Sequence, residues 1–195
     1  MPSKEKTCAE NFSRLIDVPL ENIAIAFLGQ AGFCIKTHTG SMMAIDPYLT
    51  DCVERIAGFK RMIPSVVTPE FLDADIFLAT HSHPDHLDKD ALPFFAKRPA
   101  AFFIGSADCE ASYKSAGIYG NRFKILRVGD EIKIGDFHVR ATYADHGNLA
   151  PDAIGYLISA GGITIYNVGD SAYVPEKILK SLGNAKVDVM IAPIN

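Results

Sequence analysis

The sequence predicts a single α/β domain, and three observations support this fold class. Short apolar runs typical of buried strands recur along the chain, for example at 75–79 and 101–105. Two pairs of such runs are separated only by turn residues, which indicates β-hairpins. Segments that begin with capping residues separate other strands and indicate helices. With 195 residues, the chain can bury roughly 70% of its unfolded surface in one core.

The first part of the domain is expected to be a β-meander. Residues 1–20 are polar and weakly patterned, so they are assigned to an N-terminal arm, and the domain spans 21–195. Apolar runs broken by glycine-containing turns predict strands at 23–28, 33–37 and 42–45. The segment 48–69 is expected to be irregular because glycine and proline interrupt it. Within it, Lys60 and Arg61 could meet an anionic substrate group or lie in a solvated loop.

The later elements alternate between strands and helices. Asp88 is expected in the first turn of one helix and Ser106 at the cap of another. The run at 124–128 is expected to pair with the strand that follows it, and the two hairpins turn at 135–136 and 160–162. His138 is expected to face solvent from its strand, and His38 to be exposed in a turn. Strands are predicted at 75–79, 101–105, 124–128, 131–134, 137–143, 154–158, 163–168 and 187–192, and helices at 87–97, 107–116 and 174–182.

Three of the six histidines lie in the run His81-Ser82-His83-Pro84-Asp85-His86, just after the predicted strand at 75–79. An extended backbone would direct His81 and His83 to the same side. Asp85 and His86 follow where the chain turns, and could bind a second ion beside the first. Neutral imidazole and carboxylate are ligands of divalent metals, so the pattern predicts a metal centre at a strand end. The alternative is a solvated, histidine-rich loop.

Asp46 is a further candidate at a strand end. It follows the apolar run at 42–45 and precedes Pro47. We expect it to face the site and to hold a metal-bound histidine through a hydrogen bond. An Asx-type turn residue before proline is the alternative.

Composition limits the partners of the chain. The formal net charge is −4, and lysines and arginines are scattered, so neither a nucleic acid nor a membrane surface is an expected partner. No apolar run follows the charged N-terminus, which argues against a signal peptide. The four cysteines, Cys8, Cys34, Cys52 and Cys109, form no Cys-x-x-Cys motif and are interpreted as reduced thiols of a cytoplasmic protein.

The histidine-rich run resembles the signature of the metallo-β-lactamase-fold hydrolases. Its continuation, Asp85-His86-Leu87-Asp88, departs from the Asp-His-x-Gly-Gly of glyoxalases and many lactamases. Three other segments make the chain similar to the branch that contains L-ascorbate-6-phosphate lactonase and related metal-dependent hydrolases. They are Leu28-Gly29-Gln30-Ala31-Gly32-Phe33, Ile45-Asp46-Pro47 and Gly169-Asp170-Ser171-Ala172-Tyr173. The resemblance covers 23–195 and implies an αββα sandwich, truncated here to its N-terminal half plus part of the second sheet.

The resemblance also implies a site for two divalent ions, zinc or manganese, with iron as a further option. The first ion would be held by His81, His83 and His146, and the second by Asp85 and His86. Asp170 would bridge the two ions. Without the resemblance, His146 would be an ordinary strand-end residue, and Asp170 could cap the helix at 174–182.

Two more residues are expected near the metals because of the resemblance. Gln30 and Tyr173 would support the ligands or contact the substrate, although Gln30 could equally stabilise its turn. No histidine follows His146, whereas the superfamily supplies another one for the second ion, so the chain is expected to be incomplete at its C-terminus. An uncovered sheet face would then favour homo-oligomers.

The implied activity is hydrolysis by a metal-bound hydroxide. The expected substrate is a lactone or other ester of a small, sugar-acid-like molecule that could carry a phosphate. Asp85 would act as the catalytic residue by orienting the hydroxide and carrying a proton. Three alternatives stay open: a phosphodiesterase or nuclease, which the negative charge disfavours; a di-iron oxygen-reducing enzyme, whose branch has Glu in place of His83; and a metal-binding fragment without activity.

Overall fold

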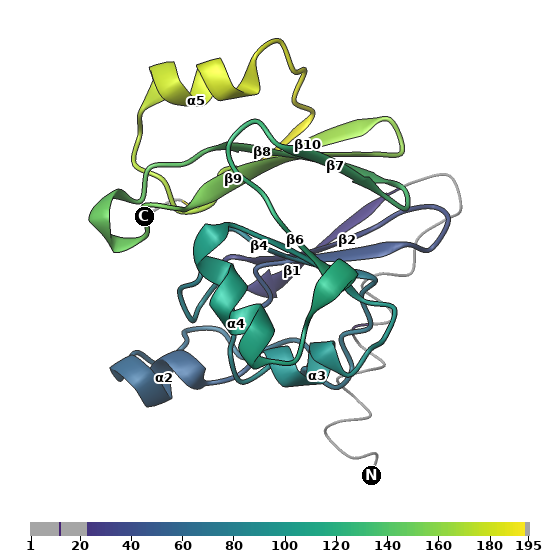
Figure 1. Ribbon diagram of the computed structural model, residues 1–195, viewed down its shortest axis with the longest axis vertical. Helices are drawn as coiled ribbons and strands as arrows, with labels where there is room; N and C mark the ends of the chain where they lie inside the picture. Colours follow the sequence, from purple (N-terminus) through teal and green to yellow (C-terminus); the bar gives the residue numbers. More distant parts are fainter. Residues whose placement is uncertain (1–11, 13–22, 194–195) are drawn as a thin grey trace.

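The computed structural model describes residues 12 and 23–193. The N-terminal arm predicted at 1–20 lies outside the described residues, apart from Phe12, which is buried. Two β-sheets pack face to face and carry helices on their outer faces, which gives the four layers seen in Figure 1. The predicted αββα arrangement is therefore confirmed for the described part of the chain.

The first sheet contains the strands of the N-terminal half. Its first three strands form the predicted antiparallel meander, and the next three are added in parallel. The order across the sheet follows the chain: β1 (Ala24–Gly29), β2 (Gly32–Lys36), β3 (Met42–Ile45), β4 (Ile76–Ala79), β5 (Phe102–Gly105) and β6 (Phe123–Ile125).

The second sheet is built from the two predicted hairpins and one further strand. The hairpin strands are antiparallel, and the last strand is parallel to its neighbour. The order across the sheet is β11 (Val189–Ile191), β10 (Ile163–Asn167), β9 (Ile154–Ala160), β8 (Phe137–Tyr143) and β7 (Glu131–Ile134). Two expectations on histidines are confirmed: the His138 side chain is 38% exposed beside Glu131, and His38 is exposed.

Helices cover the outer faces of both sheets (Figure 1). The first sheet carries α2 (Cys52–Ala57), α3 (Leu92–Ala96) and α4 (Glu110–Ser115), and the second carries α5 (Pro175–Leu182). Three short 3-10 turns lie at Ala107–Cys109, Gly120–Arg122 and Gly147–Leu149. Because α5 packs on the outer face of β9 and β10, part of the face that was expected to be bare is covered. No helix within residues 23–193 is long and apolar enough to cross a membrane.

The core has one layer between the sheets, one under the helices of the first sheet and a smaller one under α5. Ile45 and Leu78 of the first sheet pack against Val139 of the second. Phe77 and Phe103 point the opposite way and stack at 5.4 Å between ring centroids beneath the helices. The central strands are thus buried on both faces, which is why they are continuous apolar runs rather than alternating ones.

Four local predictions are wrong. The segment 48–69 was expected to be irregular because of its glycine and prolines, but it contains the helix α2. The helix expected at 87–97 begins only at Leu92, because Asp88 accepts hydrogen bonds from backbone N–H groups of the preceding turn and so acts before the helix. The strand predicted at 124–128 is β6, which pairs with β5 in parallel instead of with the strand that follows. In the helix predicted at 107–116, the first turn is 3-10, and the Ser106 hydroxyl donates to Asp108 instead of capping the backbone.

Candidate metal centre

Loops from both sheets meet at one edge of the sandwich. His81 follows the end of β4, His146 follows β8, and Asp170 follows β10. Two hydrogen bonds tie the sheets together at this edge: the Ile154 N–H donates to the Thr80 carbonyl at 3.1 Å, and the Tyr156 hydroxyl donates to the carbonyl at the end of β4 at 2.8 Å. Residues far apart in sequence are thereby held around one point.

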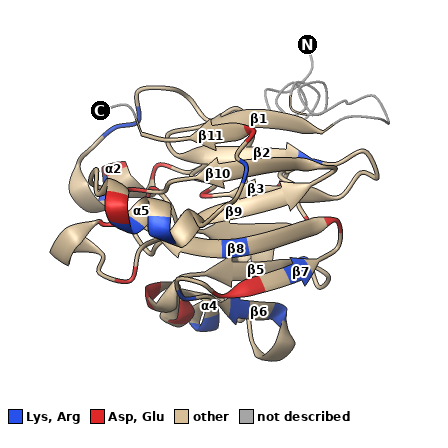
Figure 2. Ribbon diagram, turned by 90° about the horizontal axis from the view of Figure 1, so that it is seen from above, with Lys and Arg blue, Asp and Glu red and all other residues tan. Residues whose placement is uncertain are grey.

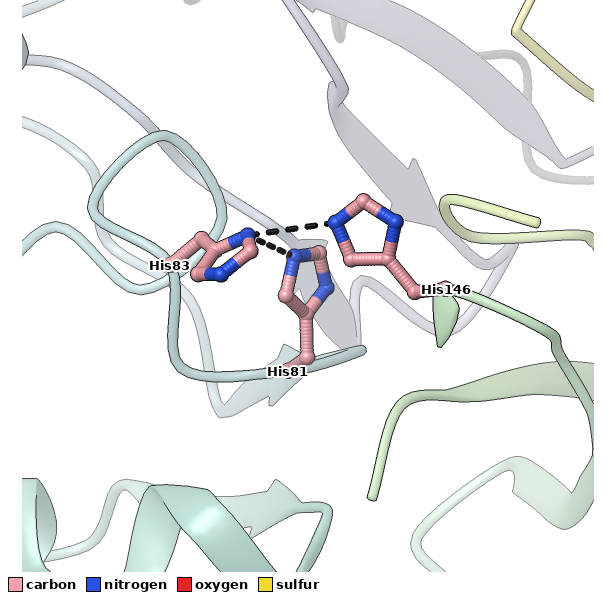
Figure 3. A group of neighbouring side chains, drawn as sticks. All are labelled: His81, His83 and His146. Carbon is pink, nitrogen blue, oxygen red and sulfur yellow. Dashed lines mark hydrogen bonds between the residues drawn. The ribbon is translucent and has the colours of Figure 1, made fainter. Parts of the chain in front are cut away.

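The first group of ligand atoms consists of three imidazoles (Figure 3). His81 Nε2 lies 2.9 Å from His83 Nδ1, and His146 Nε2 lies 3.2 Å from the same nitrogen. His83 Nε2 lies 3.2 Å from the Leu149 carbonyl oxygen and donates its proton there. The Nδ1 lone pair of His83 therefore points toward the other two rings, as a tridentate nitrogen site requires.

A second group adjoins the first and shares His81 with it. His86 Nε2 lies 3.3 Å from Asp170 Oδ2, and the ligand atoms of His81, His86 and Asp170 all lie within 4.8 Å of one another. Asp170 also approaches His146, at 3.8 Å. Asp85 stands farther out, with its carboxylate 3.8 Å from His86 Nε2 and its side chain 40% exposed. Helix α5 begins at Pro175 with Val174 at its cap position, so Asp170 does not cap it.

Asp46 lies behind the second group, at the place expected from the sequence. Its Oδ2 accepts a hydrogen bond from His86 Nδ1 at 2.8 Å, and its side chain is 1% exposed. This contact leaves Nε2 of His86 facing Asp170. The φ angle of Asp46 is 44°, a left-handed conformation that a non-glycine residue adopts at a cost. The carboxylate is thus held in place against its backbone preference.

The charges in the cluster follow from burial and from neighbouring groups. Burial, with the nearby His86 and His83 rings, lowers the pKa of His81 to about 3, so this imidazole is neutral. For His86, burial acts to lower the pKa, but Asp46 and Asp170 outweigh it and raise the pKa to about 10. The hydrogen bond from His86 lowers the pKa of Asp170 to about 2 against the effect of burial. A divalent cation would compete with the proton on His86 for the same nitrogen.

These donors fit a divalent metal. Three imidazole nitrogens point to one place, and a carboxylate and a fourth imidazole stand beside them. Nitrogen and carboxylate ligands suit zinc, manganese and iron alike, so the donor set does not discriminate among them. A carboxylate oxygen pair can also span two ions, which gives Asp170 a role that an imidazole cannot take.

The other predicted residues lie on the surface or serve the fold. Gln30 is exposed in the turn between β1 and β2, and Tyr173 is 88% exposed. The Arg61 side chain is only 7% exposed: its guanidinium donates to the carbonyls of Tyr48 and Thr50 and lies 4.2 Å from the Tyr48 ring centroid. The idea that Arg61 meets a substrate anion is therefore not supported by its position.

Two acidic residues that support the site, Asp108 and Asp88, were not predicted to do so from the sequence. Asp108 accepts a hydrogen bond from the Ser82 N–H at 3.0 Å, which holds the loop between the first two ligands. Asp88 is 2% exposed and its carboxylate accepts from the loop after β3 and from the turn before α3. The signal for Asp88 was present in the sequence, because it stands where the related motif has glycine.

Comparison with known proteins gives the family. The family model described as the beta-lactamase superfamily domain matches residues 47–195. The chain belongs to this superfamily. A UPF0173 protein of Pyrococcus abyssi is 32% identical over 170 residues, which are 87% of this chain and 69% of that protein. A UPF0173 metal-dependent hydrolase of Polynucleobacter asymbioticus is 28% identical, over 87% of this chain and 63% of the relative.

A more distant relative carries a specific activity in its name. The probable L-ascorbate-6-phosphate lactonase UlaG of Escherichia coli is 27% identical over 77% of this chain and 54% of its own length. The chain therefore spans between about half and about two thirds of the length of these curated relatives. Among solved structures, a possible metal-dependent hydrolase from Veillonella parvula superposes with a TM-score of 0.70 at 22% identity, over 85% of this chain and 69% of that one. The chain is a metal-dependent hydrolase of the metallo-β-lactamase fold.

Proposed function

We propose that the centre holds two divalent ions and hydrolyses a lactone or other ester of a small, sugar-acid-like substrate. The observation that carries this proposal is the convergence of His81, His83 and His146 beside His86 and Asp170. His81, His83 and His146 would hold the first ion, His86 and Asp85 the second, and Asp170 would bridge them. When bound, the ions would supply Lewis acidity and an activated water.

The chain's own residues would divide the remaining work. Asp85 is exposed enough to reach a substrate and close enough to His86 to stay in the centre, so it would orient the attacking water and pass a proton to the leaving group. Asp46 would keep the His86 ring in place. Leu149, through its carbonyl, would do the same for His83.

The ester preference rests on similarity and charge. The Escherichia coli relative is named as a lactonase, which supports a related carbonyl substrate here. Acidic and basic residues are interspersed over the elements in Figure 2, and the net charge is −4. Such a surface gives little attraction to a polyanion, which makes a nuclease the weaker alternative.

Metal content and a substrate panel test the proposal. Protein purified without chelators should contain about two ions per chain by elemental analysis. Aryl esters and lactones should be hydrolysed faster than bis(4-nitrophenyl) phosphate. One ion or fewer would refute the two-ion centre, and a preference for the phosphodiester would refute the ester assignment.

The role of Asp85 is tested by one substitution and its control. Asp85→Asn should lower the rate by about 10²–10⁴ without loss of metal. Asp152→Asn is the control, because Asp152 is exposed in the loop before β9. An unchanged rate in Asp85→Asn with metal retained would remove Asp85 from the reaction.

A further inference from the structure

The Thr80 hydroxyl lies behind both groups of ligands, at the centre of a buried hydrogen-bond network. Thr80 is fully buried and Asp46 is 1% exposed. Thr80 Oγ1 lies 2.8 Å from Asp46 Oδ2, 3.1 Å from His81 Nδ1 and 3.2 Å from His86 Nδ1. The Thr80 N–H also donates to Asp46 Oδ1 at 2.8 Å. One hydroxyl therefore contacts a carboxylate and a ligand from each group.

The proton positions follow from what each group can donate. A hydroxyl has one proton, and a carboxylate only accepts, so Thr80 donates to Asp46 at the shortest of its three distances. His86 Nδ1, at 2.8 Å from Asp46 Oδ2, donates to the carboxylate as well. The lone pairs of Thr80 Oγ1 are then free to accept the proton on His81 Nδ1. His81 consequently turns an unprotonated Nε2 toward the site, and His86 turns its Nε2 toward Asp170.

Packing prevents the Thr80 side chain from moving away. Its carbonyl is bound by the Ile154 N–H, and Gly169, which precedes Asp170, lies directly against it. A Cβ atom at Gly169 would come within 3.2 Å of Thr80 Cγ2. The methyl group is thus wedged against the second sheet, and the hydroxyl is held toward Asp46 and the two imidazoles.

We propose that Thr80 is a positioning residue: its hydroxyl determines which nitrogen of His81 faces the site and, through Asp46, couples the ligands of the two ion positions. This inference rests on the ligand roles proposed above. Without the hydroxyl, the Nδ1 proton of His81 has no acceptor, and the ring is free to turn or to change tautomer. Asp46 loses one of its donors at the same time, so metal binding should weaken although Thr80 touches no ion.

Two substitutions separate the hydroxyl from the methyl group. Thr80→Val keeps the shape and removes the hydroxyl, whereas Thr80→Ser keeps the hydroxyl and removes the methyl. Zinc affinity, measured by competition with a chromophoric chelator, should fall about 10–100-fold in Thr80→Val and stay close to wild type in Thr80→Ser. Circular dichroism before the titration shows whether each variant is folded.

Nitrogen-15 NMR of histidine-labelled, zinc-loaded protein gives a readout that a loss of packing would not produce. Wild type should show slowly exchanging Nδ1 protons for His81 and His86. Thr80→Val should lose the signal of His81 and keep that of His86, because His86 still donates to Asp46. If the Val variant does not fold, the wild-type spectrum decides: an unprotonated or rapidly exchanging Nδ1 on His81 would overturn the inference, and a protected one would support it.

The outcomes distinguish this inference from the proposed function. Equal zinc affinity in wild type and both variants would refute the role of Thr80 and leave the metal centre intact. Weakening in the Ser variant alone would assign the effect to the methyl contact with Gly169, and equal weakening in both variants would show that any change at this position disturbs the site. Either result would refute the role of the hydroxyl. A wild-type chain that binds no zinc, manganese or iron would refute the proposed centre and the coupling together.

Discussion

Asp88→Asn should destabilise the fold by about 3 kcal/mol. The carboxylate is 2% exposed and accepts five hydrogen bonds. Its Oδ2 accepts from the backbone of Leu49 and Thr50 at 2.9 and 2.7 Å. Its Oδ1 accepts from the Thr50 hydroxyl at 2.7 Å and from the backbone of Asp90 and Ala91 at 3.1 Å each. One side chain thus joins the loop after β3 to the turn that follows the histidine-rich run.

The magnitude follows from the count of donors. An asparagine presents only one oxygen, so its NH₂ group must face at least two of these N–H or O–H donors. Each buried donor left without an acceptor costs about 1–3 kcal/mol, which gives roughly 2–6 kcal/mol for the pair. Domains of this kind are stable by about 5–15 kcal/mol, so the loss is a large share of the total.

Equilibrium urea denaturation measures the effect, and Asp90→Asn is the matched control. Asp90 lies two residues away but pairs with Arg55 at the surface, with side chains 41% and 62% exposed. Such a pair contributes at most about 1 kcal/mol. Both variants and wild type should be compared with chelator present, so that metal binding does not contribute. Equal free energies of unfolding for the two variants would refute the account of Asp88.

Two further predictions concern close packing and buried thiols. Gly169→Ala should lower the free energy of unfolding by about 2–4 kcal/mol, because φ is +66° and the new methyl would meet Thr80 and the Ile154 carbonyl. The control Gly58→Ala, with φ of +76° and open space around it, should cost about 1 kcal/mol. Equal melting temperatures for the two variants would contradict this prediction. Three cysteines should resist a thiol reagent at pH 8 until the chain unfolds, since all are buried and burial raises each thiol pKa, for two of them to about 12. They are Cys34, Cys52 and Cys109. More than one fast-reacting thiol per chain would show that this part of the core opens readily.

Much of the fold could be predicted because its signals are local. The runs at Ile76–Ala79 and Phe102–Gly105 are apolar at every position, as strands covered on both faces must be. The hairpins were recognisable from alternation and from turn residues between the strands. The helix α2 was not predicted, because glycine and proline interrupt the segment 48–69. The partner of β6 was not predicted, because strand pairing depends on the whole sheet.

The sequence by itself indicated that the histidine-rich run binds metal, because His81 and His83 are two residues apart and point to the same side of an extended backbone. Only the tertiary structure decided that His146 and Asp170 meet this run, because both come from the second sheet and reach it through the packing of one sheet on the other. The packing of loops and helices on the outer face of the first sheet turned Arg61 inward and made Asp88 a buried acceptor. Such roles depend on which donors and acceptors the fold brings within about 3 Å, and no local pattern encodes that distance.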